Sequence, residues 1–131
     1  MKNNELRIGN YVQHKGEIVK VEQITKHKIG YHRYKNKNTM QYLRVSEIEP
    51  IEITEDFLLQ KGFEKKYLKV FSQSCLVYND EEVILRLHSK PYYWFLMIDF
   101  GLLTLNKQMK SIHELQNAYY IVSGKELNLK F

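Results

Sequence analysis

The chain has 131 residues, of which 44% are hydrophobic and 13% aromatic, and its formal net charge is +5. This length suits one domain, or two small modules that share a core, and this composition excludes an intrinsically disordered chain. The apolar runs are far shorter than the roughly 20 residues that cross a bilayer, and the first residues lack the apolar region of a secretory signal. Cys75 has no second cysteine with which to form a disulfide. We therefore expect a monomeric, cytoplasmic protein without a membrane partner.

The segment from Leu6 to Ile24 predicts two strands that are joined at Lys15-Gly16, because glycine tolerates the positive φ of a tight hairpin. The glycines and branched residues that set its spacing are Gly9, Val12, Gly16, Val19 and Ile24. This spacing resembles the opening of small SH3-like barrels, including KOW-type modules of translation and transcription proteins. The resemblance implies an SH3-like β module over residues 1–53.

Two further strands are predicted from Lys28 to Tyr34 and from Thr39 to Val45, with a polar turn over residues 35–38 between them. From Lys20 to Arg44 there are seven basic residues and one acid, so this segment carries more positive charge than the whole chain. Lysine and arginine neutralise phosphates and tyrosine stacks on unpaired bases, a combination used to bind single-stranded nucleic acid. The same pattern also suits a solvated surface. The residues that we predict to bind nucleic acid or a partner are Lys26, Lys28, Tyr31, Arg33, Tyr34, Lys35, Lys37, Tyr42 and Arg44.

Residues 54–131 predict an antiparallel meander with two helices. Thr54 is a suitable N-cap and Gly62 a suitable end for the first, short helix. The strands expected after it cover residues 66–72, 75–78, 83–88 and 93–98. Leu127, Leu129 and Phe131 alternate as a possible last strand.

The second helix is predicted from Ser111 to Gly124. Ser111 and Glu114 have the spacing of a capping box, and Gly124 supplies the left-handed residue that ends a helix. Its apolar side chains recur every three or four residues and therefore line one face that a sheet can cover. The expected fold class is α+β, with this helix packed on the sheet. The residues of the apolar face are Ile112, Leu115, Ala118, Tyr119 and Val122.

No spacing in the chain is typical of a catalytic or metal site. The histidines, His14, His27, His32, His88 and His113, form no zinc-ligand pattern. Cys75 has no local nucleophile motif, and a buried structural cysteine is the favoured interpretation. The acids at residues 80–82 suit a solvated turn better than an acid–base pair. The aromatic run over residues 92–95 suits a strand covered on both faces better than a ligand-stacking platform. We therefore expect no enzyme activity, no cofactor and no metal.

Two segments near the ends of the chain carry a resemblance. They are Glu5-Leu-Arg-Ile-Gly-Asn-Tyr-Val12 and His113-Glu-Leu-Gln-Asn-Ala-Tyr-Tyr120, the latter followed by Ser123-Gly-Lys-Glu-Leu127. Together they resemble a family of short uncharacterised proteins of bacterial genomes and prophages. The resemblance implies an accessory role without an assigned reaction. In size and basic character the chain is also similar to anti-CRISPR inhibitors of type VI RNA-targeting effectors.

Three functions remain open at this point. The first is a non-catalytic binding protein that docks its basic, tyrosine-rich face on RNA or a ribonucleoprotein, which would suit inhibition of a CRISPR RNA-guided nuclease and antagonism of host defence by a phage. The second is a protein–protein adaptor with an acidic partner and no nucleic-acid contact. The third is a small enzyme whose site is assembled from scattered residues.

Overall fold

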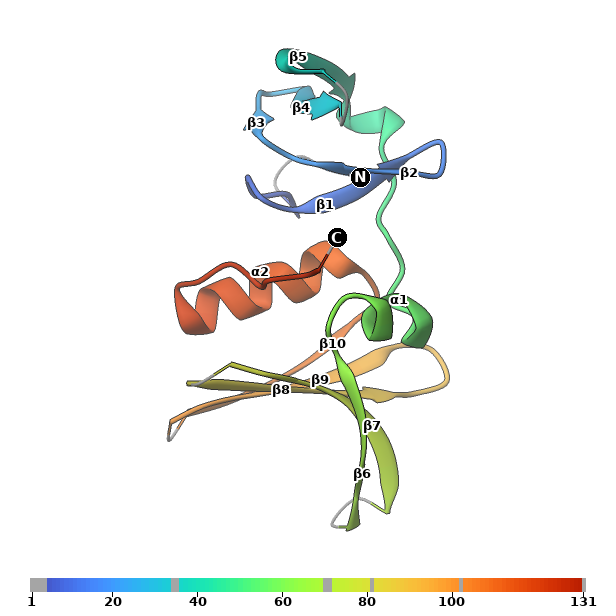
Figure 1. Ribbon diagram of the computed structural model, residues 1–131, viewed down its shortest axis with the longest axis vertical. Helices are drawn as coiled ribbons and strands as arrows, with labels where there is room; N and C mark the ends of the chain where they lie inside the picture. Colours follow the sequence, from blue (N-terminus) through green and yellow to red (C-terminus); the bar gives the residue numbers. More distant parts are fainter. Residues whose placement is uncertain (1–4, 34–35, 70–71, 81, 102, 131) are drawn as a thin grey trace. The chain divides into compact units, whose positions relative to one another are not determined.

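A computed structural model describes residues 5–33, 36–69, 72–80, 82–101 and 103–130. Within these ranges the strands form three antiparallel sheets and are accompanied by two α-helices, which confirms the α+β class. The chain divides into two compact units (Figure 1). Unit 1 comprises residues 1–52 and 111–117, and unit 2 comprises residues 53–110 and 118–131. The sequence predicted modules over residues 1–53 and 54–131.

The strands of unit 1 form a two-stranded sheet, β1-β2, and a three-stranded sheet, β3-β4-β5, in the part of the unit that the structure describes. The predicted hairpin at Lys15-Gly16 is confirmed, since both residues have positive φ, 49° and 80°. β5 begins at Asn36, inside the segment that was predicted to be a turn. The strands are β1 (Tyr11–His14), β2 (Glu17–Lys20), β3 (Gln23–Ile24), β4 (Lys28–Arg33) and β5 (Asn36–Arg44).

The two sheets of unit 1 enclose an apolar core. Alternation along the strands turns every second side chain inward, so short strands suffice to bury it. β1 also exchanges two backbone hydrogen bonds with Glu49, at 2.8 and 2.9 Å, beside its pairing with β2. The described strands nevertheless close no barrel, and the expected SH3-like barrel is not confirmed. The buried residues of this core are Leu6, Val12, Val19, Val21, Ile29, Tyr31, Val45 and Ile48.

Unit 2 contains an antiparallel sheet whose described strands follow the order β10-β9-β8-β7-β6. Four of them match the predicted meander, and β10 was not predicted. The predicted strand at Leu127 and Leu129 is wrong over the described residues. Both side chains are buried, but the neighbouring Lys130 N–H donates to the Lys61 carbonyl and no ladder forms. The strands are β6 (Glu64–Leu68), β7 (Gln73–Asn79), β8 (Val83–Ser89), β9 (Trp94–Phe100) and β10 (Leu103–Met109).

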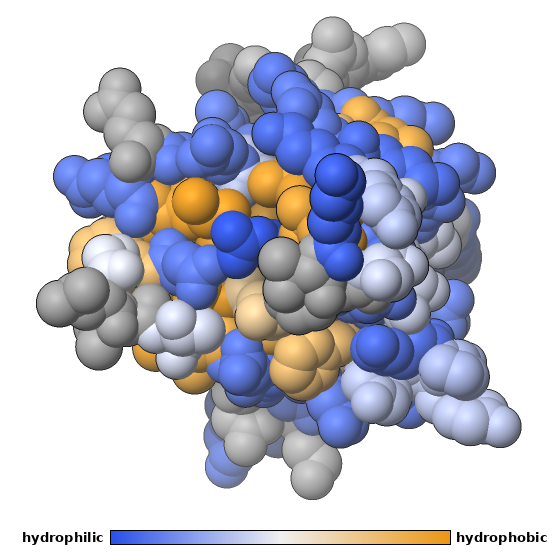
Figure 2. All heavy atoms as spheres, turned by 90° about the horizontal axis from the view of Figure 1, so that it is seen from below, coloured by the Kyte–Doolittle hydropathy of each residue, from blue (hydrophilic) through white to orange (hydrophobic). Residues whose placement is uncertain are grey.

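The two faces of this sheet differ in burial. On the inner face the cross-strand partners Leu76, Leu87 and Leu96 are buried, as are Leu85 and Ile98. The outer face is less uniformly buried, since Val77 and His88 are buried but half-buried residues of mixed chemistry lie at alternate positions of β8 and β9. Figure 2 shows hydrophobic side chains gathered among hydrophilic ones at the surface. The half-buried outer residues are Ile84, Arg86, Phe95, Met97 and Asp99.

Both predicted helices are confirmed. α1 (Glu55–Gln60) begins after Thr54, whose hydroxyl accepts a 3.1 Å hydrogen bond from the Phe57 N–H. α2 (Ile112–Ser123) begins after Ser111, whose hydroxyl donates to the Glu114 carboxylate at 2.7 Å. It ends at Gly124, with φ of 72°. The first half of α2 belongs to unit 1 and the second half to unit 2.

Candidate nucleic-acid interface

One face of the β3-β4-β5 sheet gathers the basic and aromatic residues. The register pairs Lys28 with Arg44, Gly30 with Tyr42 and His32 with Met40. Because side chains alternate along a strand, these six residues share one face, and Ile29 and Leu43 lie on the opposite face, which is buried or half-buried in the core. The strand pattern thus separates the basic side from the apolar side. We call the six residues the basic face.

Tyr42 is the aromatic residue of the basic face, and its side chain is 52% exposed. Its hydroxyl donates to the Gln23 Oε1 at 2.9 Å, which fixes the direction of the ring. Opposite Tyr42 lies Gly30, where an added Cβ would lie 2.9 Å from the Met40 sulfur and 3.0 Å from the Gln23 Cβ. Glycine therefore lets these side chains close over β4, and the Tyr42 ring is left half exposed beside them.

Lys28 and Arg44 are exposed and directly opposite each other at the end of the β4-β5 ladder. Like charges in this position destabilise a sheet. Among the described residues no carboxylate forms an ion pair with either of them. Two cations held together in this way attract an anion such as a phosphate.

At the other end of the basic face, His32 Nδ1 contacts the Glu22 carboxylate. This contact places the only acid between Lys20 and Arg44 against the single histidine of the face. Met40 lies beside it and is half-buried. The positive charge of the face is therefore concentrated at Lys28 and Arg44.

The other predicted binding residues have different positions. Lys26 is exposed in the turn before β4. Tyr31 is 6% exposed and lies in the core of unit 1, so its ring is not available for stacking. Arg33 ends β4 and Lys37 lies in β5. Tyr34 and Lys35 fall outside the described residues.

Sequence reasoning missed the contributions of Gln23, Gly30 and His32 to this face. The signal that could have found them is the cross-strand register, since residues that alternate along β5 share a face with their partners on β4. That register cannot be set from the predicted turn, because β5 begins at Asn36 and a bulge interrupts the ladder between His32 and Arg33.

The two segments that carry the family resemblance meet in unit 1. Gln116, which is 1% exposed, accepts from the Tyr11 N–H at 2.8 Å and donates to the Gly9 carbonyl at 3.0 Å. Asn117 accepts from the buried Asn10 amide at 2.8 Å and donates to the Glu5 carbonyl at 3.1 Å. These bonds satisfy buried polar groups and give the segments a structural role.

The remaining candidates for chemistry have little support in the described residues. Cys75 is 3% exposed, and burial raises the pKa of its thiol, which favours the unreactive protonated form. No cluster of three or more His, Cys, Asp or Glu that could hold a metal is found in the described ranges. Within those same ranges, no helix is both long and apolar enough to span a membrane.

Comparison with protein-family models, with curated proteins and with solved structures finds no match to this chain. The resemblance to short prophage proteins therefore stays a prediction.

Proposed function

We propose that the basic face binds single-stranded RNA without catalysing a reaction. The observation that supports this most directly is the exposed Lys28–Arg44 pair on the same face as the half-exposed Tyr42 ring. Phosphate contacts supply most of the affinity in such complexes, and an aromatic ring contributes about 1–3 kcal/mol per stacked base. The neighbouring basic residues of the segment extend the positive charge along the chain.

The dimensions of the face suit an unpaired strand. A two-residue step along a β-strand is about 6.6 Å, so Tyr42 lies one such step from Arg44. This step places a cation next to an aromatic ring, as needed to contact both the backbone and a base of an unpaired strand. In a duplex the bases are stacked on one another, so the ring of Tyr42 would have no base to stack on.

The test is fluorescence anisotropy with a labelled oligouridine, a labelled oligothymidine and an RNA duplex. Lys28→Glu/Arg44→Glu should abolish binding at moderate salt. The milder Lys28→Gln/Arg44→Gln should reduce the salt slope by roughly 1.4, because each phosphate contact on a single strand contributes about 0.7. Tyr42→Leu should weaken binding of the single strands about tenfold and leave any duplex binding unchanged.

The matched control is Lys65→Glu/Lys66→Glu, which makes the same change of charge on exposed strand residues of unit 2. It should bind like the wild-type protein at the same moderate salt. Equal losses for the two double variants would show that only the net charge matters. If no oligonucleotide binds, and an acidic protein binds the wild-type chain in a way that depends on Lys28, the adaptor function replaces this proposal.

The biological setting that we propose is inhibition of a CRISPR RNA-guided nuclease, on the basis of the resemblance to prophage and anti-CRISPR proteins. A protein that holds guide RNA or its ribonucleoprotein would block target cleavage. The test is an RNA cleavage assay with a purified type VI effector and its guide, with wild-type protein and the Lys28→Glu/Arg44→Glu variant. Uninhibited cleavage would overturn this setting while leaving RNA binding to be judged by anisotropy.

A further inference from the structure

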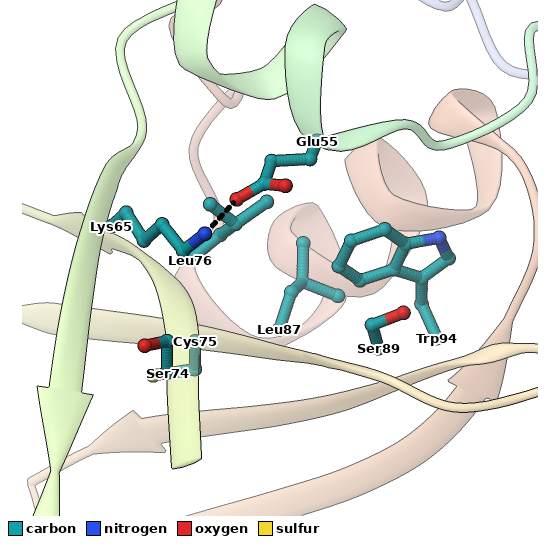
Figure 3. A pocket seen from close by; sticks show the side chains of 8 residues that line it. All are labelled: Glu55, Lys65, Ser74, Cys75, Leu76, Leu87, Ser89 and Trp94. Atoms are coloured by element: carbon teal, nitrogen blue, oxygen red, sulfur yellow. Dashed lines mark ion pairs between the residues drawn. The ribbon is translucent and has the colours of Figure 1, made fainter.

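Unit 2 contains a cavity of about 220 Å³ on the inner face of its sheet (Figure 3). Cross-strand partners build its floor, since Lys65 pairs with Leu76 and Leu76 pairs with Leu87. The two leucines are 2% and 0% exposed, so the floor is apolar and rigid. The residues that line the cavity are Glu55, Lys65, Ser74, Cys75, Leu76, Leu87, Ser89 and Trp94.

The Trp94 indole forms a wall of the cavity, and its orientation is fixed. Its Nε1–H donates a 2.9 Å hydrogen bond to the Ile53 carbonyl, and its cross-strand partner is Ser89. Figure 3 shows Ser89 beside the indole and Ser74 on the far side of the cavity, next to Cys75. An apolar ligand group can therefore rest against the half-buried indole, above this floor.

An ion pair lies at the opposite rim. The Lys65 ammonium and the Glu55 carboxylate are 2.9 Å apart, and both side chains are about half exposed, at 55% and 43%. Figure 3 shows this pair beside the apolar floor, with Trp94 across the cavity. The ammonium has three donors and the carboxylate has two oxygens, so each group can contact one further partner of opposite charge. The rim thus presents one positive and one negative site side by side.

We propose that this cavity binds a free α-amino acid with an apolar side chain. The ligand carboxylate contacts Lys65 and the ligand ammonium contacts Glu55, while the side chain lies over the leucine floor against Trp94. The volume agrees, because drug-sized ligands need about 300–1,000 Å³ and a single amino acid needs less. An internal peptide residue lacks both charges and would leave the rim without a ligand.

The test uses the single tryptophan as a reporter. L-phenylalanine is titrated into ¹⁵N-labelled protein while the Trp94 indole N–H resonance is followed. We expect saturable shifts with a Kd on the order of 1 mM, as befits a ligand with so few atoms. N-acetyl-L-phenylalanine, which lacks the ammonium, and L-phenylalaninamide, which lacks the carboxylate, should each bind about fivefold more weakly.

Two variants and a matched control complete the test. Lys65→Gln should weaken L-phenylalanine binding and remove the preference over the amide, and Ser74→Phe should fill the cavity and abolish saturable shifts. Lys66→Gln is the control, because Lys66 is also exposed on β6 and pairs with Glu64, but it lies on the other face of the strand. Absence of a saturable indole shift would overturn the proposal. So would equal binding of all three probes, or equal effects of the two lysine variants.

Discussion

Units 1 and 2 hold the two halves of α2 by different chemistry. In unit 1 the first half is fixed by side-chain amides, because Gln116 and Asn117 bond to the backbone and side chains of the segment around Asn10. In unit 2 the second half is fixed by Tyr119, whose ring lies edge-on to Tyr78 with centroids 5.9 Å apart. Because Ile112 and Leu115 of the first half are also fully buried, packing acts along the whole helix, and side-chain amides add hydrogen-bond specificity at its N-terminal end.

Removal of the packing in unit 2 should have the largest effect. Tyr119 is 1% exposed, and its hydroxyl donates to the Asp80 carboxylate at 2.8 Å. Tyr119→Ala should therefore cost about 3–5 kcal/mol of unfolding free energy, measured by urea denaturation. Ile121→Ala, at an 80% exposed position two residues on, should change stability by less than about 0.5 kcal/mol. Comparable losses would show that the assigned helix face is wrong.

Removal of the Gln116 amide in unit 1 should have the next largest effect on stability. Gln116→Ala removes two partly buried hydrogen bonds at once, those with the Tyr11 N–H and the Gly9 carbonyl, and should cost about 1–3 kcal/mol in total. Gln13→Ala is the control, since its amide makes one exposed bond to the Pro50 carbonyl. It should cost less than about 1 kcal/mol. A loss at Gln116 no larger than that at Gln13 would contradict the comparison.

A smaller, pH-dependent effect is expected at His113, which is 4% exposed. Burial lowers the pKa of this imidazole from its ordinary 6.5, against the opposite influence of Glu114 and Glu5. The unfolded chain therefore binds the proton more readily, so stability is full above about pH 6.5 and falls as the pH decreases toward the folded-state pKa.

The measurement is the urea midpoint of the wild-type protein and His113→Leu at about pH 7.5 and about pH 5.5. The variant removes the titrating group, so it should lose less stability on acidification than the wild type. His88 in unit 2 has its pKa lowered in the same direction by burial, and it supplies the acid sensitivity that remains in the variant. If the urea midpoints of the two proteins differ by the same amount at both pH values, His113 does not contribute to the acid sensitivity.

The smallest effect should come from a polar contact in unit 2. The Ser123 hydroxyl donates to the Tyr119 carbonyl at 2.7 Å and accepts from the Lys125 N–H at 3.1 Å, at the half-exposed end of the helix. Ser123→Ala should cost about 0.5–1 kcal/mol, because water can replace these partners. A loss as large as that of Gln116→Ala would mean that both ends of α2 depend equally on polar contacts.

The sequence predicted what depends on local chemistry. Both helices and the hairpin at Lys15-Gly16 were found, because a cap or a left-handed glycine acts within four residues of itself. β10 was missed because its pairing with β9 fixes a segment whose own residues, from Asn106 to Gln108, are polar. Leu127 and Leu129 alternate with polar residues as in a strand, and both are buried. Without a neighbouring strand, however, their segment forms no ladder of backbone hydrogen bonds.

The candidate site was predicted in composition and not in arrangement. Lys28, Tyr42 and Arg44 share a face, whereas Tyr31 lies in the core. Successive side chains of a strand point to opposite faces, and the basic residues and tyrosines of β4 and β5 occur at odd as well as even positions. The hydrogen bond that Asn10 donates to Asn117 could not be read from residues so far apart in the chain.

The order in which the two units are completed during synthesis follows from the path of the chain. Unit 1 takes residues 1–52 and then, after the strands of unit 2 have been made, residues 111–117. At about 5–20 residues per second, a ribosome needs several seconds to make the segment between these pieces. Asn10 and the Tyr11 N–H must therefore wait for Gln116 and Asn117, and the strands of unit 2 emerge before the first unit is whole.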